Sequence, residues 1–382
     1  MKRISLIAAF VTAAFVSCGP KYTEPTSEPG LALAYSMSFI RNVVENSGEN
    51  ENLVISPYSA GVALSMLAEG AEGTTKDEFN KALNDCLFKA EDLGGNDTVI
   101  VNSVNSLWID NDFSIRNRYV DLLQKDFDAL AITQDFADPA TVHAINNWCS
   151  EHTNGKITDV IDRLSPGDVM VLANALYFNA PWLNPFDKNL TAKADFNGSK
   201  GKTQVDMMYR KGHINYGEYQ GCQFVELPYE GERYSMFVLL PPDDLDINSA
   251  ISYLNTNTFK AAKSMLEPKE VMLKMPKFKA ETSLLLNKTL QSMGIKTAFT
   301  PAANFKGIAE MGPLSLGMVK QKCLVDVSEQ GTEAAAVTVA QVRLTSVRPS
   351  SYITMTVNRP FAFFIVDSTN DNVMFAGRIM NL

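Results

Sequence analysis

The chain has 382 residues, of which 46% are hydrophobic and 20% are charged, and its formal net charge is −9. This composition is that of an ordinary globular protein, and it excludes a disordered chain, a disulfide-dense mini-protein and a collagen-like repeat. Because nucleic-acid affinity depends mainly on clustered cations that neutralise phosphates, the acidic balance and the lack of a Lys/Arg block argue against DNA or RNA partners.

The first residues have the layout of a secretory signal peptide, which we assign to residues 1–17. Lys2 and Arg3 form a positive end, an apolar run from Ile4 to Val16 follows, and small residues come next. The apolar run is shorter than the ~20 residues that a membrane-spanning helix needs.

Residues 15–18, Phe-Val-Ser-Cys, resemble a bacterial lipoprotein cleavage site, with Phe where Leu is usual. This resemblance implies export and a lipid on Cys18, which would place the protein on the periplasmic or the outer face of a bacterial outer membrane. Ordinary secretion with cleavage nearby is the alternative.

Residues 18–30 are predicted to be a tether, because the stretch from Pro20 to Pro29 has three prolines and no large aliphatic residue. The remaining residues, 31–382, show no internal linker. We therefore expect one folded unit after the tether.

Four further cysteines are widely spaced and form no Cys-x-x-Cys motif: Cys86, Cys149, Cys222 and Cys323. They allow three disulfide pairings that the sequence cannot rank. Their apolar neighbours favour buried free thiols. Without a Cys/His cluster a zinc site has no support, and no cofactor is expected.

Helices are predicted mainly in the first half, from apolar spacing and capping signals, over residues 33–44, 56–68, 75–83 and 139–152. Ser56 and Pro57 supply an N-cap and a first-turn proline. The sequence Thr75-Lys-Asp-Glu78 has the form of a capping box.

Strands are predicted mainly in the second half, over residues 169–178, 234–240, 271–279, 352–358, 361–367 and 373–379, with a helix at 283–293. The first of these strands is apolar on both faces except for Asn174, so this side chain must be hydrogen-bonded inside the fold. This mixture of elements predicts an α+β protein.

Motifs for catalysis are lacking. The chain has three histidines, His143, His152 and His213, and neither a Gly-x-Ser-x-Gly nor a phosphate-binding loop accompanies them. The adjacent carboxylates Asp243 and Asp244 follow two prolines, so solvated turn residues are the favoured interpretation. The sequence therefore argues against an enzyme.

The segment from Gly331 to Thr345 has no proline and no further glycine. Read by alternation, one face carries small residues and then larger apolar ones, and every charge falls on the other face. This pattern suits a strand that enters a sheet with one face on a core. A helix, which the run of three alanines favours, or a permanent edge strand is equally compatible with the pattern.

Several motifs occur in a fixed order along residues 31–382: Asn52–Ser59, Leu64–Met66, Gly70-Ala71, Asn174, Phe178, Trp182, Pro185-Phe186, Leu227–Tyr229, Pro276–Phe278, Met293–Ile295, Glu329–Ala336, Asn358–Phe361 and Phe375–Arg378. Together and in this order they resemble the serpin family. The resemblance implies a serpin fold of three β-sheets with eight or nine helices and an exposed reactive-centre loop.

The resemblance also implies a function. The protein would be a monomeric inhibitor of serine, and also cysteine, endopeptidases. The protease would cleave the loop and be held as a covalent acyl-enzyme while the loop inserts as a new strand of the large sheet. A non-inhibitory serpin that acts as a binding protein is the alternative, and the small residues of the segment argue against it.

The resemblance assigns roles to residues in three groups. The loop hinge consists of Glu329, Gly331, Thr332, Glu333, Ala334, Ala335 and Ala336. The shutter and breach of the sheet consist of Ser56, Ser59, Asn174, Trp182 and Gln321. The reactive bond, sixteen residues beyond Glu329, lies between Thr345 and Ser346, with Arg343 and Leu344 as neighbours.

The chain departs from the family pattern at two points. Gln321 stands where many serpins have His; it can still hydrogen-bond Asn174, but it cannot titrate near neutral pH. The stretch from the hinge to Asn358 is also a few residues longer than usual. A loop one residue shorter than the usual spacing would place the scissile bond at Leu344-Thr345, and the longer loop leaves Arg348-Pro349 as a further alternative.

Overall fold

The computed structural model describes residues 30–382 except 91–92, 95–97, 166, 311–313 and 334–351. Within this described part there are eight α-helices: α1 (Leu31–Glu45), α2 (Pro57–Gly70), α3 (Gly73–Ala82), α4 (Asn117–Phe127), α5 (Ala140–His152), α6 (Ile247–Ser252), α7 (Thr256–Ser264) and α8 (Asn287–Ser292).

The strands form two hydrogen-bonded sheets. The nine-stranded sheet has the order β1 (Leu53–Ile55), β15 (Val373–Ile379), β14 (Phe361–Asp367), β8 (Tyr234–Leu240), β7 (Cys222–Pro228), β6 (Gly201–Tyr219), β9 (Glu267–Pro276) and β13 (Ile353–Thr356), with β5 (Ala192–Gly198) paired to β6. The six-stranded sheet has the order β10 (Phe278–Leu285), β11 (Met318–Val327), β12 (Gly331–Thr332), β4 (Met170–Pro181), β2 (Ile100–Asp110) and β3 (Leu130–Gln134).

The fold is α+β, as predicted, and β6 explains how the three expected sheets are joined into two. This strand is 19 residues long. Its first part pairs with β5, its middle with β9 and its last part with β7. Hydrogen bonding therefore continues along one strand through two of the expected sheets.

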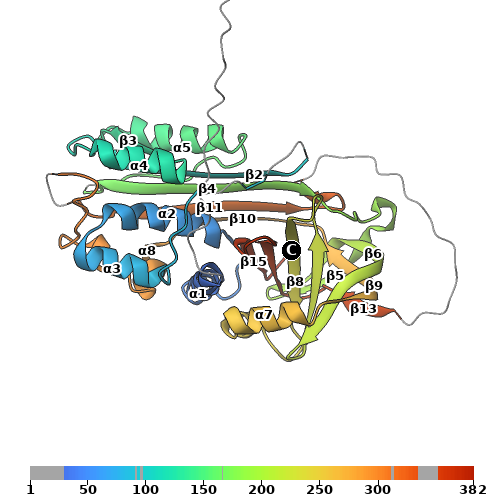
Figure 1. Ribbon diagram of the computed structural model, residues 1–382. Helices are drawn as coiled ribbons and strands as arrows, with labels where there is room; N and C mark the ends of the chain where they lie inside the picture. The colour runs from blue at the N-terminus through green and yellow to red at the C-terminus, as the bar shows by residue number, and fades with distance from the viewer. Residues whose placement is uncertain (1–29, 91–92, 95–97, 166, 311–313, 334–351) are drawn as a thin grey trace, which may run out of the picture.

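Helices cover both faces of the six-stranded sheet (Figure 1). α2 packs between this sheet and β15, and almost all of its side chains are buried. α5 packs on the opposite face over β2 and β4, where Trp108, Cys149 and Val171 belong to a second apolar cluster. The main core therefore lies on the α2 side of the sheet, and a smaller one lies under α5.

Local signals placed several elements correctly. β8, β14 and β15 have the predicted bounds. Ser56 is the N-cap of α2, its Oγ accepts a hydrogen bond from the Ser59 backbone N–H (3.1 Å), and Pro57 occupies the first turn. Capping and continuous apolar runs are strong local signals, so these elements could be read without tertiary information.

The predicted capping box is wrong. α3 begins at Gly73, and no side chain caps it. Thr75 Oγ1 accepts the backbone N–H of Asn304 (3.0 Å), and the Glu78 carboxylate accepts that of Thr297 (2.7 Å). Tertiary contacts with a distant segment therefore engage the side chains that the local pattern assigned to the cap.

Two other boundaries also differ from the prediction. The predicted strand over residues 271–279 is two strands, since β9 ends at Pro276 and β10 begins at Phe278. The predicted helix over residues 283–293 begins too early, because β10 extends to Leu285 in register with β11. Pairing with a neighbouring strand thus overrides the helical propensity of the Leu-rich stretch.

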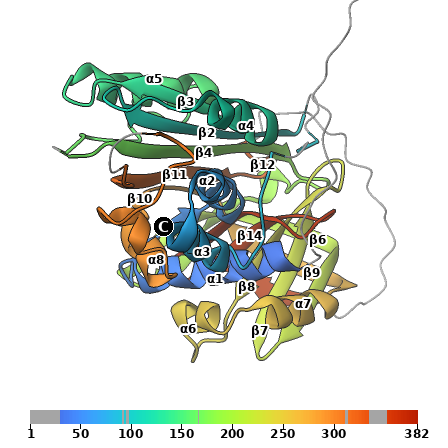
Figure 2. The same ribbon diagram turned by 60° about the vertical axis from the view of Figure 1, so that its left-hand side comes forward.

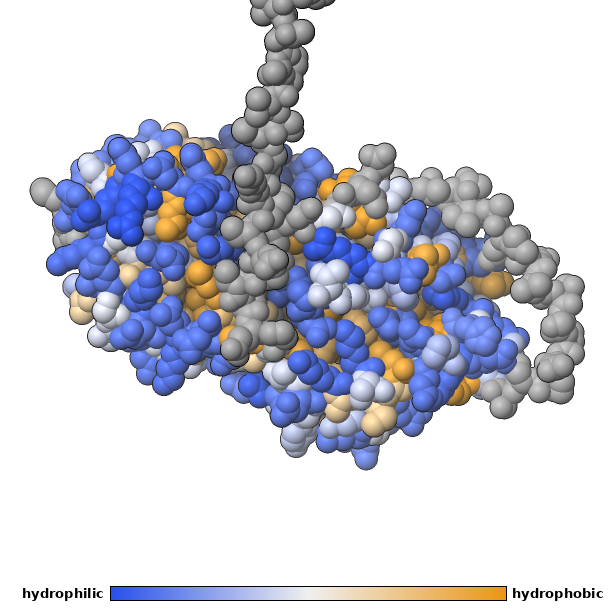
Figure 3. Space-filling view, in the orientation of Figure 1, coloured by the Kyte–Doolittle hydropathy of each residue, from blue (hydrophilic) through white to orange (hydrophobic). Residues whose placement is uncertain are grey.

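The surface is mostly hydrophilic on the face shown in Figure 3, with separate hydrophobic patches. The exposed large hydrophobic residues of the described chain are scattered: Leu130, Leu183, Leu190, Tyr253, Met265 and Leu285. Among the described helices, none combines the length and the apolar character that crossing a bilayer requires.

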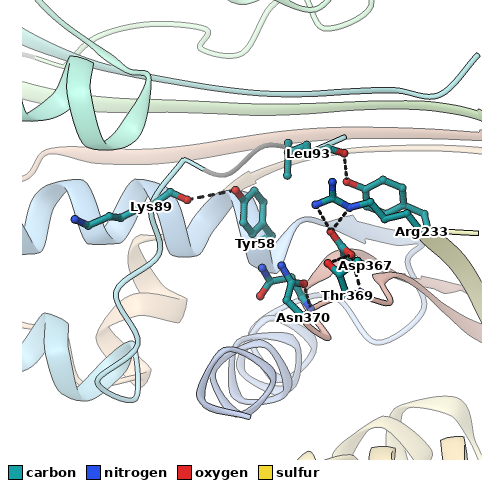
Figure 4. A network of polar contacts seen from close by, with 9 residues as sticks. Tyr58, Lys89, Leu93, Arg233, Asp367, Thr369 and Asn370 are labelled. Atoms are coloured by element: carbon teal, nitrogen blue, oxygen red, sulfur yellow. Dashed lines mark hydrogen bonds and ion pairs between the residues drawn. The ribbon is translucent and has the colours of Figure 1, made fainter. Parts of the chain in front are cut away.

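A buried ion pair joins the ends of β8 and β14 (Figure 4). Arg233 Nε and Nη2 each donate to Asp367 Oδ2 at 2.8 Å. The Thr369 backbone N–H and hydroxyl donate to the other carboxylate oxygen, and the Asp367 side chain is 0% exposed. Every oxygen of this buried carboxylate is therefore paired, as a charge out of water requires.

We expect Asp367→Ala to lower the free energy of unfolding by about 3 kcal/mol, because it leaves the Arg233 guanidinium without this carboxylate partner in a partly buried site. The matched control is Asp243→Ala, since the Asp243 side chain is 90% exposed and pairs with Arg359 at 3.0 Å. That variant should change the free energy by less than about 0.5 kcal/mol. Denaturant and thermal unfolding measure both variants. Equal losses of unfolding free energy would show that the Arg233–Asp367 pair is no more stabilising than the exposed pair.

Candidate functional site

β12 is a two-residue strand that lies between β4 and β11 (Figure 2). Thr332 pairs with Ala180 of β4 on one side and with Val327 of β11 on the other, antiparallel to both. The predicted loop hinge therefore enters the six-stranded sheet by two residues.

Beyond β12 the sheet is closed. β4 and β11 pair directly and in parallel, from Val171 with Met318 to Leu176 with Cys323. The two strands are thus neighbours over their first halves and are separated only near their carboxyl ends. At the open end, β12 already lies between β4 and β11. A strand that continued beyond β12 would have to separate the residue pairs that join β4 directly to β11.

Gly331 is required by a close approach of two backbones. A Cβ at this position would lie 2.1 Å from the Ala180 carbonyl oxygen and 2.6 Å from the Pro181 Cα. Real side chains do not make such contacts, and the obstacle is backbone rather than a flexible side chain. Any other residue would push β12 away from β4.

An aromatic and polar cluster surrounds Thr332. Trp182 stacks on Tyr229, with ring centroids 4.4 Å apart, and the Tyr229 hydroxyl is 2.6 Å from Thr332 Oγ1. Trp182 Nε1 donates to the Ser328 carbonyl (3.0 Å). Thr332 is fully buried, and burial also raises the pKa of Tyr229. The hinge is therefore held by specific contacts.

Glu329 anchors the other end of the hinge. Its carboxylate accepts from Thr191 Oγ1 at 2.9 Å and pairs with Lys277 Nζ at 3.1 Å, and only 5% of its side chain is exposed. Burial alone would raise the pKa of this carboxyl, but its own backbone N–H, Lys277 and Thr191 outweigh burial and lower the pKa. Glu329 is thus held as a paired carboxylate.

Glu333 is buried to the same degree but is paired differently. Its backbone N–H donates to the Asp326 carbonyl at 2.7 Å, and its residue conformation is left-handed with φ 51°. The nearest cation is Lys156, whose Nζ is 3.7 Å from Oε2, and Oε2 accepts no hydrogen bond. Burial is the largest influence and raises the pKa of this carboxyl.

Four of the predicted shutter residues meet under the closed part of the sheet. Asn174 Nδ2 donates to the Ser59 carbonyl (3.0 Å), and Gln321 Nε2 donates to Asn174 Oδ1 (3.0 Å). Gln321 also exchanges two hydrogen bonds with the Ser56 backbone, at 2.9 and 3.1 Å. Gln321 therefore joins β4, β11 and the start of α2 with an uncharged amide.

The structure adds partners that sequence reasoning did not assign. Asn105 of β2 accepts from Asn174 Nδ2 at 2.5 Å, and Tyr229, Lys277 and Lys156 contact the hinge. Tyr229 and Lys277 lie inside short motifs of the sequence, and these motifs could have identified them as contacts of the hinge. Asn105 and Lys156 lie in unmarked segments, and the strand that contains Asn105 was not predicted.

Several predicted residues lie outside the described part of the chain. These are Ala334, Ala335, Ala336, Arg343, Leu344, Thr345, Ser346 and Cys18. The signal segment and all of the tether except Gly30 also lie there.

The four cysteines of the folded unit are buried free thiols. Burial raises the pKa of Cys149 to about 12 and also raises that of Cys323, which lies in β11 two residues from Gln321. Across the described residues, no group of three or more His, Cys, Asp or Glu side chains is arranged to hold a metal ion.

A family model described as "Serpin (serine protease inhibitor)" matches residues 32–382. The chain is 33% identical over 357 residues to an uncharacterized serpin-like protein of Methanosarcina acetivorans, covering 87% of this chain and 82% of that protein. It is 32% identical over 368 residues to a serine protease inhibitor of Cyanea capillata, covering 91% and 96%. Among solved structures, it is similar to the native state of the thermophilic serpin tengpin, with TM-score 0.86, 28% identity, and 94% and 96% coverage.

We expect Gln321→Ala to lower the free energy of unfolding by about 2–4 kcal/mol, because it leaves Asn174 and the Ser56 backbone with unmade hydrogen bonds in a buried site. Gln291→Ala on the exposed surface of α8 is the matched control and should change the free energy by less than about 0.5 kcal/mol. Thermal unfolding measures the difference. Equal melting temperatures for the two variants would show that the amide is not structural.

Proposed function

Because the chain belongs to the serpin family, we propose that it inhibits serine endopeptidases, with cysteine endopeptidases as a second class, by inserting its cleaved loop into the six-stranded sheet. The observation that carries this proposal is β12, which is hydrogen-bonded to β4 and β11 on both sides. Serpins are protease inhibitors rather than catalysts, so residues 334–351 would serve as bait for a protease.

The register of β12 supports insertion along the whole gap. Six residues beyond Thr332 is Thr338, and six residues back along β4 and β11 are Asn174 and Gln321. These two residues are already paired with each other across the closed part of the sheet. A strand that continued β12 without a shift would therefore place Thr338 between them, within reach of the same polar groups.

The chemistry of the segment suits the two sides of that strand. Residues in phase with Thr332 would face the main core beside Leu172 and Leu176, and they begin with alanines. Residues in phase with Glu333 would face the α5 side, where Val171 and Ala173 belong to the smaller cluster. All charges of the segment fall on this second side, so insertion would bury no charge in the main core.

The proposed reaction uses the target's own catalysis. The hydroxyl oxygen of the protease serine attacks the carbonyl carbon of Thr345, the peptide C–N bond breaks, and the Ser346 amine leaves with a proton. Thr345 is then esterified to the protease. Insertion of the freed strand from Thr332 to Thr345, 13 steps or roughly 43 Å at ~3.3 Å per residue, would carry the protease along the sheet before water can hydrolyse the ester.

We expect the mature protein to form a complex with a serine protease that survives denaturing electrophoresis and to release a C-terminal fragment that begins at Ser346. Thr332→Arg should abolish the complex and leave a cleaved substrate, because Thr332 is fully buried beside Tyr229 and a guanidinium there would keep the hinge out of the sheet. Thr332→Val keeps the volume without a charge, and it should retain most of the complex. Cleavage without any complex for the unmodified protein would favour the non-inhibitory alternative.

We also propose that the protein is exported and that Cys18 carries a lipid, on the basis of residues 1–18 alone. Growth with a labelled fatty acid should label the expressed protein and fail to label Cys18→Ala. Export of both forms without any label would instead favour ordinary secretion. The folded unit is expected to act as a monomer in either case.

A further inference from the structure

The side chain of Glu333 lies in an unusual place for a carboxylate. It is 5% exposed, and its Oε2 accepts no hydrogen bond. The charged and titratable groups that face it come from four elements: Tyr177 of β4, Asp326 of β11, Lys279 of β10, and Lys156 in the turn after α5. Asp326 repels the charged form of Glu333, whereas Lys156, a hydrogen bond from Tyr177 and Lys279 favour it. Lys156 forms an ion pair with Glu333.

The turn that carries Lys156 is firmly seated on the α5 face of the sheet. Ile157, Val160 and Ile161 are buried in the cluster under α5. Lys322 of β11 donates to the Thr158 carbonyl at 3.2 Å. The turn therefore presents Lys156 to the hinge from a fixed position, whereas the hinge contributes only a short strand to the sheet.

The backbone of Glu333 marks the depth at which the hinge stops. β12 ends at Thr332, and Glu333 has φ 51°, a left-handed conformation that is strained for a residue with a Cβ. A longer inserted strand would need Glu333 to become extended. Deeper insertion therefore has to change the present backbone conformation of Glu333.

We propose that the buried Glu333 makes docking of the hinge depend on pH, and that Lys156 is a positioning residue that keeps the hinge docked when Glu333 is charged. This inference rests on the proposed function, because docking of the hinge is the first step of insertion. Lys156 acts on the loop only through Glu333, so its role is to position the hinge.

The sign of the pH dependence follows from burial. Because docking raises the pKa of Glu333 above its ordinary value of 4.5, docking is strongest below that pH and weakens as pH rises through the higher, docked pKa. Glu329 has the opposite sign: its lowered pKa makes its contribution full above 4.5, and that contribution is lost as pH falls through the docked pKa. The two glutamates therefore act in separate pH windows.

Hydrogen exchange of the peptide spanning residues 326–333 tests the contact directly, because protection of its amides reports how often the hinge leaves the sheet. After correction for the intrinsic exchange rate, protection in the unmodified protein should fall as pH rises above 4.5. Glu333→Gln, which mimics the neutral acid, should remove this fall. Lys156→Met should lower protection about two- to fivefold at pH 7, the usual range for a partly exposed ion pair.

The double variant and a remote control complete the test. Glu333→Gln with Lys156→Met should match Glu333→Gln alone, because a neutral side chain needs no cation. Lys76→Met removes a similar ion pair with Glu69, at 3.8 Å, far from the hinge, and should leave hinge protection unchanged. A pH profile that persists in Glu333→Gln, or an unchanged profile in Lys156→Met, would overturn the proposal.

The covalent-complex assay on the same preparations separates this proposal from the proposed function. In the unmodified protein, protection that does not change with pH, together with intact complex formation, would reject the positioning contact alone. A normal pH profile without any complex would reject the inhibitory function and keep the contact.

Discussion

The parallel pairing of β4 with β11 is the constraint on which the rest of the structure depends. Six residues of each strand pair directly, and beyond them the strands diverge around β12. Buried backbone N–H and C=O groups must find partners, so a sheet that opens at one end needs a strand in the opening. The hinge supplies two residues of that strand. Any longer strand would have to separate β4 from β11 in the closed half of the sheet.

Polar side chains hold both halves of this sheet in their present state. Asn174 and Gln321 join the closed half to the start of α2 by uncharged hydrogen bonds. At the open end, Glu329 and Glu333 sit on either side of β12. Glu329 is paired with Thr191 and Lys277, whereas one oxygen of Glu333 accepts no hydrogen bond and lies 3.7 Å from Lys156 Nζ. The contrast between a fully paired and an incompletely paired carboxylate therefore lies at the open end of the sheet.

Prediction of the fold succeeded where the local pattern was unambiguous. β8, β14 and β15 are buried along their whole length and are read as apolar runs, and Ser56 with Pro57 marks the start of α2. It failed where a segment serves two environments. β6 is the clearest case, because its buried side alternates in one phase up to Met207 and in the other phase from Met208 onward. A strand that changes the face it buries has no single period to detect.

By itself the sequence determined the family, the hinge segment and the residue types that the hinge needs, such as Gly331, where only a hydrogen atom fits against Ala180. Only the tertiary structure decided the depth to which the hinge enters the sheet and the environments of its two glutamates. Glu329 and Glu333 are four residues apart, yet burial and partners move their pKa values in opposite directions. Those partners, Lys277, Thr191 and Lys156, come from distant segments of the chain, and a contact made across the fold leaves no local pattern in the sequence.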